Sequence, residues 1–283
     1  MNTLTAFNHF TAELKEQDTT MPVLFIGHGS PMNGIEHTEF SAYWSRLAKE
    51  IPTPKAVVVI SAHWLTQGTK ITAMDLPPTI HDFGGFPQAL FDVQYPAPGD
   101  AALAMETKSL IHSTTVELDH DWGLDHGTWT IVRHMYPDAS IPVLQLSIDY
   151  TKGPQYHYAL AKELAALRKK GVLIFGSGNM VHNLRMVHMP NRSFDDFNKE
   201  YAFDWASEMN ELFKRHILEG NHTPLINYTT LHSAAQLAIP TPDHYYPLLY
   251  TLGLQGKRDE ASIFNDKLLA GSLSMTSVKL SAA

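Results

Sequence analysis

The chain has no cysteine among its 283 residues. This absence excludes disulfide bonds, thiolate catalysis, iron–sulfur clusters and zinc sites that use cysteine sulfur. Any metal that the protein binds must therefore be held by nitrogen and oxygen atoms. Histidine, by contrast, is abundant, with 16 residues along the chain. Neutral imidazole is the commonest protein ligand for metals, so these histidines are the first candidates.

Long apolar runs are also lacking. No stretch approaches the roughly 18 consecutive apolar residues that a bilayer-spanning helix needs. Residues 1–20 carry Glu13, Lys15, Glu16 and Asp18 and lack the apolar core of a signal peptide. We therefore expect a cytoplasmic protein that does not enter membranes, in which residues 1–20 form a mobile arm before the fold begins at Met21.

Positive charge is scarce as well, with 21 basic against 29 acidic side chains and a net charge of -8. No basic stripe of the kind that binds phosphate backbones is present, so nucleic acid is not an expected partner. The HExxH, GxSxG and GxxxxGK[ST] motifs are absent. Ser30 and Ser177 follow glycines but lack the spacing of a nucleophile elbow, so serine catalysis is not expected.

Short apolar runs alternate with helical patterns along the chain, which is typical of an α/β fold. The runs are continuously hydrophobic, which indicates a central, mostly parallel sheet with helices on both faces. The predicted strands are 22–27, 56–61, 70–74, 114–118, 141–148, 171–176 and 273–280. The predicted helices are 38–50, 99–112, 127–135, 154–170, 194–218 and 243–252. No linker or repeat divides the chain, so residues 21–283 are expected to form a single domain.

One long connection, from Pro77 to Asp100, has no predicted element of its own and is rich in proline and glycine. Long ordered loops in compact domains are often lids or binding loops. The alternative is a surface excursion packed by its own aromatic side chains, Phe83, Phe86, Phe91 and Tyr95. The sequence leaves both interpretations open.

Four histidines stand out because each follows a strand-like run and a small residue: His28, His63, His182 and His244. The carboxyl ends of parallel strands meet at one edge of an open sheet, where such folds place their ligands. Four strand ends that are far apart in sequence can therefore gather at one point. We interpret these histidines as a metal site, and expect at least three of them to share the ion.

His126 differs from these four because the sequence LDHGTWTIV indicates the start of a helix, with Asp125 as its N-cap. The residue is either a histidine hydrogen-bonded locally near the cap or a donor aimed into a pocket. A neighbouring pattern, FGSGNMVHN, resembles a dinucleotide fingerprint but lacks the third glycine, since Val181 takes its place. Its glycines are expected to shape a loop that presents Asn179 and His182 inward.

A set of motifs in fixed order resembles one known family. These motifs are GHGSP, SAHW, TIHDFGGFPQ, YPAPG, DHGTW, VLQLSID, GSGNMVHNLR, IPTPDHYYPLLYTLG and GSLSMTSVKL. Together they are similar to those of the bacterial 4,5-DOPA extradiol dioxygenases, within the LigB-type, or class III, extradiol ring-cleavage superfamily. The resemblance runs from about Met21 to Val278, nearly the whole chain.

The resemblance implies a role for each candidate histidine. It implies one divalent metal held by His28, His63 and His244, with His182 as the catalytic base and, in zinc-loaded members, a fourth ligand. It also implies that His126 orients the substrate. Relatives elsewhere in the superfamily use two histidines and a carboxylate, whereas His244 stands at the expected carboxylate position, next to Asp243. An all-nitrogen site suits Zn²⁺ as readily as Fe²⁺, which leaves the native metal open. From the resemblance we expect zinc in the protein as isolated and Fe²⁺ for dioxygenase turnover.

The expected activity is the opening of a catechol ring, such as that of L-DOPA, by O2, which gives a yellow semialdehyde. The partners are then a small aromatic diol and O2. Phe83, Trp64, Trp129 and Tyr245 are either ring clamps or core residues. The alternatives are a zinc-binding protein or zinc hydrolase without oxygenase activity or, less well supported, an interaction module. No heptad pattern indicates an interface, so the oligomeric state is left open.

Overall fold

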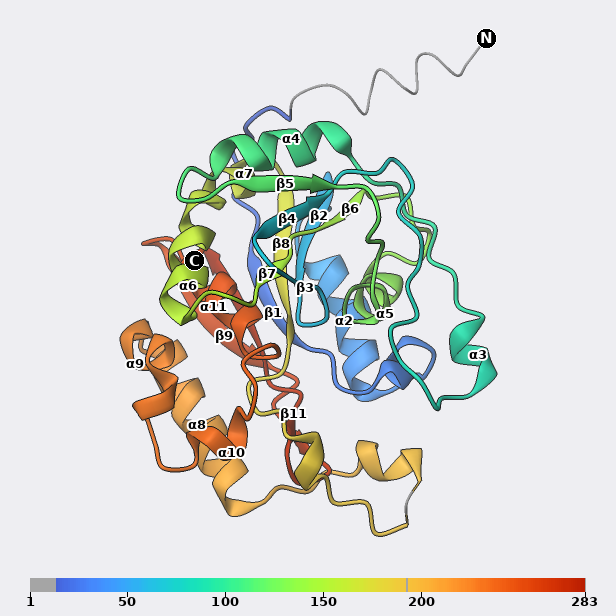
Figure 1. The fold of residues 1–283 in the computed structure, drawn as a ribbon, viewed down its shortest axis with the longest axis vertical. Coiled ribbons are helices and arrows are strands. Elements are labelled where there is room, and N and C mark those ends of the chain that lie inside the picture. Colours follow the sequence, from blue (N-terminus) through green and yellow to red (C-terminus); the bar gives the residue numbers. More distant parts are fainter. Residues whose placement is uncertain (1–13, 192, 283) are drawn as a thin grey trace.

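A sheet of six strands runs through the molecule in the computed structural model, which describes residues 14–191 and 193–282 (Figure 1). The strand order is β6-β2-β8-β1-β12-β9. Strands β6, β2, β8 and β1 are parallel, and β12 and β9 are antiparallel at one edge. The strands of this sheet are β1 (Val23–Gly27), β2 (Ala56–Ser61), β6 (Val143–Gln145), β8 (Val172–Gly178), β9 (Asp259–Phe264) and β12 (Ser277–Ala282). Short pairs lie outside it: β3 (Leu65–Thr66) with β7 (Ile148–Asp149), β4 (Thr69–Thr72) with β5 (Val116–Asp119), and β10 (Leu268–Leu269) with β11 (Leu273–Ser274).

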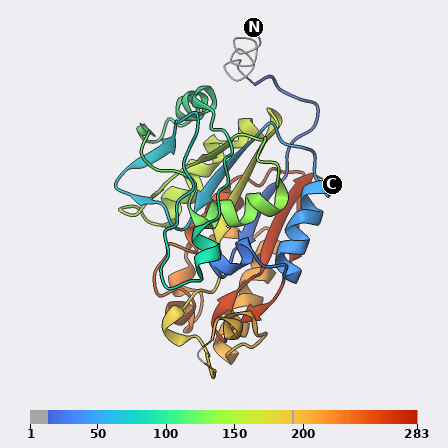
Figure 2. The same ribbon diagram turned by 90° about the vertical axis from the view of Figure 1, so that its right-hand side faces the viewer.

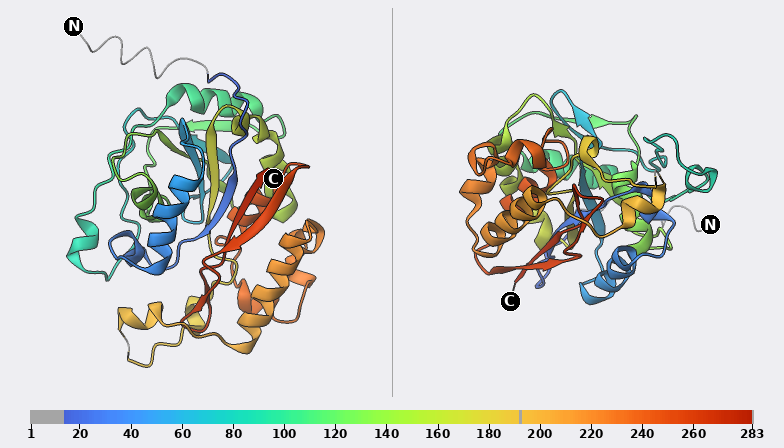
Figure 3. Two further views of the ribbon diagram at one scale, coloured as in Figure 1. Left: turned by 180° about the vertical axis from the view of Figure 1, so that it is seen from behind. Right: turned by 90° about the horizontal axis from the view of Figure 1, so that it is seen from below.

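Helices cover both faces of this sheet because its central strands are apolar on both sides. Along β1, Val23 and Phe25 belong to one hydrophobic core, while Leu24 and Ile26 belong to the other. Helices α6 (Pro154–Glu163) and α11 (Tyr246–Gly253) pack in the first core, and α2 (Glu39–Glu50) and α5 (His126–Met135) pack in the second (Figure 2). The other α-helices of the described residues are α3 (Gln88–Phe91), α4 (Ala101–Leu110), α7 (Ala165–Lys169), α8 (Asp204–Leu218), α9 (His222–Ile226) and α10 (Ala235–Ala238). Helices α8, α9 and α10 gather at one end of the molecule, near β11 (Figure 3).

The predicted α/β class and mostly parallel sheet are confirmed, and several predicted bounds were wrong. The predicted helix 194–218 begins only at Asp204, after a 3-10 turn over Phe194–Asn198. Strands 141–148 and 273–280 are each divided in two, and β9 was missed. The residues of β9 alternate between partly buried and exposed positions and include acidic side chains, as expected for an edge strand, so no continuous apolar run marked it.

Two further predictions concern the N-terminal arm of residues 1–20 and helices that could cross a membrane. Residues 1–13 of the predicted mobile arm lie outside the described residues, and within its remainder the Gln17 N–H donates to the Lys169 carbonyl at 2.6 Å. In the part of the chain that the structure describes, no helix combines the length and apolarity needed to cross a membrane.

One histidine to which the sequence suggested no chemistry is buried in the first core. The His157 side chain is fully buried, its Nδ1 lies 3.1 Å from the Tyr250 hydroxyl, and its ring packs on Tyr246 at 4.3 Å between centroids. Burial lowers the pKa of His157 to about 4. An unfolded histidine titrates at about 6.5, so between these values the unfolded chain binds a proton that the folded chain does not.

We therefore expect His157 to make the protein less stable as the pH falls from about 6.5 to about 4, with its full contribution present above that range. At pH 5 the expected loss is about 2 kcal/mol. Urea unfolding at pH 7.5 and pH 5 measures it, with His157→Gln as the control that cannot titrate. Equal pH dependence in the wild type and His157→Gln would contradict the assignment.

Candidate metal centre

Three of the four predicted strand-end histidines lie at the carboxyl ends of neighbouring strands. His28 follows β1, His63 follows β2, and His182 follows β8, which is hydrogen-bonded to both. The prediction for His244 was wrong in one respect, because this residue follows no strand. It lies in a turn just before α11, and its carbonyl accepts the Asn179 N–H at 3.0 Å, directly beyond the end of β8.

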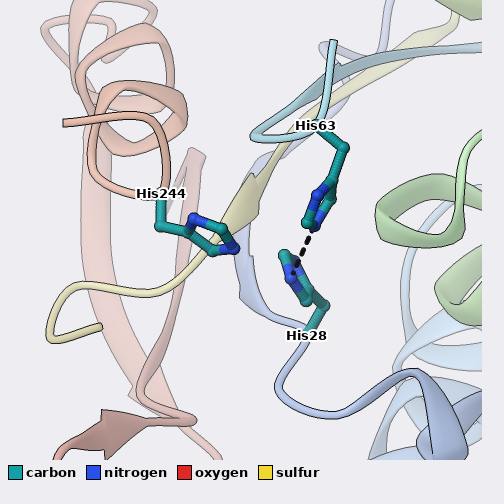
Figure 4. A group of neighbouring side chains, drawn as sticks. All are labelled: His28, His63 and His244. Atoms are coloured by element: carbon teal, nitrogen blue, oxygen red, sulfur yellow. Dashed lines mark hydrogen bonds between the residues drawn. The ribbon is translucent and has the colours of Figure 1, made fainter. Parts of the chain in front are cut away.

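The three imidazoles of His28, His63 and His244 face one another (Figure 4). One ligand atom from each lies within 4.8 Å of the other two. The Nε2 atoms of His28 and His63 are 3.2 Å apart. Two zinc–nitrogen bonds of about 2.0–2.1 Å in a tetrahedral site place their nitrogens about 3.3 Å apart. The spacing therefore fits two ligands of one ion.

Hydrogen bonds behind His28 determine which of its nitrogens faces the centre. The Ser177 hydroxyl donates to the Gly127 carbonyl at 2.5 Å, so its oxygen is left to accept from His28 Nδ1 at 3.0 Å. His28 therefore carries its proton on Nδ1 and turns the Nε2 lone pair toward His63. Such outer hydrogen bonds orient metal-binding histidines in proteins. Ser177, considered in the sequence as a nucleophile, is instead part of this support.

Carboxylates face the Nδ1 atoms of the other two imidazoles. Asp243 accepts a hydrogen bond from Nδ1 of His244, and Asp82 Oδ2 lies 3.5 Å from Nδ1 of His63. Burial raises the pKa of each carboxyl, but hydrogen bonds donated by histidine outweigh it and lower both pKa values below the usual range. Both groups are therefore ionised acceptors, and the Nε2 atoms of His63 and His244 are free to bind a cation.

Burial also decides the charge of the histidines. Desolvation, with repulsion from neighbouring imidazoles, holds the pKa of His28 and His63 well below the usual value. The pKa of His182 is lowered for the same reasons, partly opposed by Asp243. Imidazole must be neutral to bind a metal. These three side chains are therefore in the ligand-competent form at neutral pH.

His182 is arranged differently from the three facing imidazoles. Its ring stacks on that of His244, with centroids 3.5 Å apart and planes 6° from parallel. Among the described side chains, it groups with Asp243 and His244 rather than with His28 and His63. Its backbone N–H donates to the Ala238 carbonyl at 2.9 Å, which anchors it beside α10.

His126 lies on the opposite side of the group, at the first position of α5. Asp125 is the N-cap of this helix, as the sequence predicts. The His126 ring is 3.9 Å from that of His63 and 5.6 Å from that of His28, between centroids. The His126 side chain therefore faces the pocket, which is one of the two interpretations left open by the sequence. The capping hydrogen bond at the start of the helix is made by the Asp125 side chain and not by His126.

The turn that carries His126 is held by a buried polar network. Asp125 accepts hydrogen bonds from Ser61 Oγ and Gln145 Nε2, both at 2.7 Å. Burial and the nearby Asp82 raise the pKa of Asp125 to about 6. Ser61 ends β2 and Gln145 ends β6, so this network connects the His126 turn to two strands of the sheet.

Two glycines of β8 allow the segment of His244 to approach the sheet. A Cβ at Gly178 would lie 2.1 Å from the His244 carbonyl oxygen, and one at Gly176 would lie 2.3 Å from that of Pro247. The sequence predicted that the strand ends at Gly176 and that the two glycines shape a loop, whereas the strand continues through Gly178. They serve the site by allowing close backbone contact.

A cavity of about 220 Å³ opens over the imidazoles. Five histidines line it, namely His28, His63, His126, His182 and His244, together with Gly29, Ser30, Pro31, Phe83, Phe86, Leu184, Phe197 and Leu273. The loop of residues 77–100 thus contributes Phe83 and Phe86 to a binding cavity. Leu184, Phe197 and Leu273 were not predicted to line a cavity. Leu184 and Phe197 lie in short 3-10 turns and Leu273 lies in the two-residue strand β11, and single apolar residues in such elements carry no periodic signal.

The other suggested ring clamps pack elsewhere. Trp64 stacks on Trp122 with parallel planes, at 5.9 Å between centroids. Trp129 is buried and donates its indole N–H to the Ile80 carbonyl, and the buried Tyr245 donates its hydroxyl to Leu225. These three side chains belong to the core, and Phe83 is the one of the four that lines the cavity.

Comparison with known proteins gives consistent matches over nearly the whole chain. Residues 21–277 match the family described as the catalytic LigB subunit of aromatic ring-opening dioxygenase. A 4,5-DOPA dioxygenase extradiol of Escherichia coli K12 is 47% identical over 266 residues, covering 93% of this chain and 95% of that protein. A protein of the same name from Beta vulgaris is 33% identical and covers 94% of this chain and 98% of its own length.

The fold is also similar to a solved structure. The crystal structure of an uncharacterized protein from Escherichia coli K12 superimposes with a TM-score of 0.78 at 40% identity, covering 92% of this chain and 99% of the other. The family match spans the histidines of the cavity and both carboxylates behind them. The chain therefore belongs to the LigB family of aromatic ring-opening dioxygenases and is an extradiol ring-cleavage dioxygenase.

Proposed function

We propose that the protein opens the ring of a catechol such as L-DOPA by 4,5-extradiol cleavage, using O2 and one divalent metal held by His28, His63 and His244. The observation that carries this proposal is the group of three imidazoles at the floor of a cavity with aromatic walls. The names of the Escherichia coli and Beta vulgaris relatives support L-DOPA as the substrate.

The donor set fits a divalent transition metal. LigB-type dioxygenases use such a metal, and the imidazoles of His28, His63 and His244 each place one ligand nitrogen within 4.8 Å of the other two, with a hydroxyl or carboxylate facing each Nδ1. When bound, the metal supplies coordination of the catechol oxygens and a path for electrons from the ring. Imidazole suits both zinc and iron, and we propose Fe²⁺ for turnover and Zn²⁺ for the protein as isolated.

His182 is proposed as the base that takes a proton from a catechol hydroxyl and later returns it. Its ring lines the cavity, and its lowered pKa keeps it neutral and able to accept a proton. General bases of this kind accelerate reactions by about 10²–10⁴-fold. The stack on His244 also allows the alternative in which His182 completes a four-histidine zinc site.

His126 is proposed to orient the substrate from the other side. Its Nδ1 lies 2.9 Å from Asp82 Oδ2, so Nε2 is the atom available for a substrate oxygen. A neutral His126 accepts a hydrogen bond from a hydroxyl, and a protonated one donates to an oxyanion. Phe83 and Phe86 supply apolar contacts for the ring and exclude water from it.

We expect metal-free protein reconstituted anaerobically with Fe²⁺ and L-DOPA to form a yellow product on exposure to air, with one O2 consumed for each ring opened. A chelator should abolish this activity, because the proposed reaction depends on the bound metal. An oxygen electrode and the visible spectrum give the measurement, with zinc-reconstituted protein as the control. No oxygen uptake with L-DOPA or any other catechol would rule out the proposed reaction.

Family membership favours this reaction over the alternative of a zinc protein without oxygenase activity. Residues 21–283 are proposed to form the single catalytic domain, and a cytoplasmic location remains a prediction. The proposed partners are a small aromatic diol and O2, without nucleic acid or membrane.

A further inference from the structure

We propose that Asp82 is a positioning residue, whose single carboxylate orients the imidazoles of His126 and His63 so that both present Nε2 to the cavity. The orientation itself is independent of the reaction catalysed. Its catalytic consequence rests on the proposed function, in which His126 contacts the substrate and His63 binds the metal.

The contacts of Asp82 carry the proposal. Its Oδ1 accepts the backbone N–H of His126 at 2.9 Å, and its Oδ2 accepts from Nδ1 of the same residue, also at 2.9 Å. Oδ2 lies 3.5 Å from Nδ1 of His63 as well. Its side chain is 15% exposed. The Asp82 carboxylate thus faces the Nδ1 atoms of two histidines whose rings line the cavity.

These three side chains also have the spacing of a metal site, but the hydrogen bonds give a better account of them. The backbone N–H of His126 donates a hydrogen bond to Asp82 Oδ1, so this oxygen is already occupied by a donor and not by a cation. An ionised carboxylate only accepts hydrogen bonds, so the facing Nδ1 atoms carry protons. A cation between them would have to displace those protons. The Asp82 carboxylate therefore sets the tautomer of His126 by a hydrogen bond, and its charge 3.5 Å from Nδ1 of His63 favours a proton on that atom as well.

The backbone just before Asp82 is held in place at Ile80. Ile80 N–H donates to the Leu124 carbonyl at 2.7 Å, and Trp129 Nε1 donates to the Ile80 carbonyl at 2.9 Å. The next residue, Phe83, lines the cavity with its ring edge-on to His126, 5.6 Å between centroids. Asp82 is thus presented by an anchored loop, and its carboxylate joins the aromatic wall of the cavity to the histidines.

Asp82→Asn is the informative substitution. The amide oxygen can still accept the His126 backbone N–H, but the NH2 group then meets the Nδ1–H donors of the two imidazoles. Two donors cannot bond to each other, so His126 must move its proton to Nε2 or rotate away. Removal of such an orienting partner lowers metal affinity or activity by about 10–100-fold.

We expect Asp82→Asn to lower kcat by about 10–100-fold, with KM for the catechol changed by less than about threefold because the apolar wall remains. The double variant Asp82→Asn/His126→Gln should lose clearly less than the product of the two single effects, since Asp82 acts in large part through His126. Asp100→Asn is the matched control. This residue lies at the end of the same loop, where its side chain caps α4 by accepting the Leu103 N–H at 2.9 Å, and asparagine caps equally well.

A direct measurement needs no turnover. Nitrogen-15 NMR of histidine-labelled, zinc-loaded protein at pH 8 should show the His126 proton on Nδ1 in the wild type and on Nε2 in Asp82→Asn, with His126→Gln used to assign the signal. An Nε2–H tautomer in the wild type would overturn the proposal even if Asp82→Asn failed to fold. Full additivity of the two substitutions would also overturn it. Absence of oxygen uptake in the iron-loaded wild type would instead refute the proposed function and leave the tautomer result intact.

Discussion

Replacing His182 by alanine is expected to lower kcat by about 10²–10⁴-fold, the range for loss of a general base, while the metal stays bound. His182 lines the cavity but groups with Asp243 and His244 rather than with His28 and His63. The metal should therefore remain on His28, His63 and His244. Oxygen uptake measures the activity, and elemental analysis of the same sample measures the metal.

The control for this variant is His188→Ala. His188 is exposed and lies six positions further along the same segment, where its ring contacts Tyr201 at 4.8 Å between centroids. Its loss should leave kcat within about twofold, as expected for a surface substitution. If His182→Ala instead loses its metal in step with its activity, His182 is a fourth ligand. Unchanged kcat would show that it is neither base nor ligand.

Gly178→Ala should both destabilise the protein and weaken the metal site. A single added methyl group would lie 2.1 Å from the His244 carbonyl oxygen and 3.0 Å from its carbonyl carbon, with the Pro247 side chain at 3.3 Å. The strand and the His244 turn must separate, which breaks the hydrogen bond from Asn179 to His244. Overpacking costs about 1–3 kcal/mol, and loss of a buried hydrogen bond adds about 1 kcal/mol.

We therefore expect the free energy of unfolding to fall by about 2–4 kcal/mol, and metal affinity to fall by about 10-fold or more, because His244 is displaced. Urea unfolding of the metal-free protein and competition with a chelator measure the two effects separately. Gly153→Ala is the control, since a Cβ there meets nothing within 4 Å. A Gly178→Ala protein with wild-type stability and metal affinity would show that the β8 contact is unimportant.

The sequence pattern identified local structure where burial is continuous along the chain. Residues 56–61 were predicted as a strand with the observed bounds, because every side chain of β2 is buried. His28, His63 and His182 were placed beside strand ends for the same reason. The antiparallel edge strand β9 alternates in burial and includes acidic residues, so the same criterion overlooked it.

His244 and Asp82 mark the limit of that reasoning. His244 was picked out as the end of a strand, although its turn reaches the site only by packing against the glycines of β8. Asp82 lies in an irregular loop, and nothing in its neighbours along the chain indicates its contacts with His126 and His63. Family resemblance pointed to the histidines, but the carboxylates and Ser177 behind them were recognised from the coordinates alone.

The amino-acid sequence by itself determined the α/β class, the exclusion of thiolate chemistry, the family, and the set of five candidate histidines. Tertiary structure decided which imidazoles face one another, which nitrogen each presents, and which side chains enclose the cavity. The physical reason is that hydrophobic periodicity reports burial within one segment, whereas a ligand set depends on the order of strands in the sheet. Segments more than 200 residues apart, those of His28 and His244, meet only after that order is established.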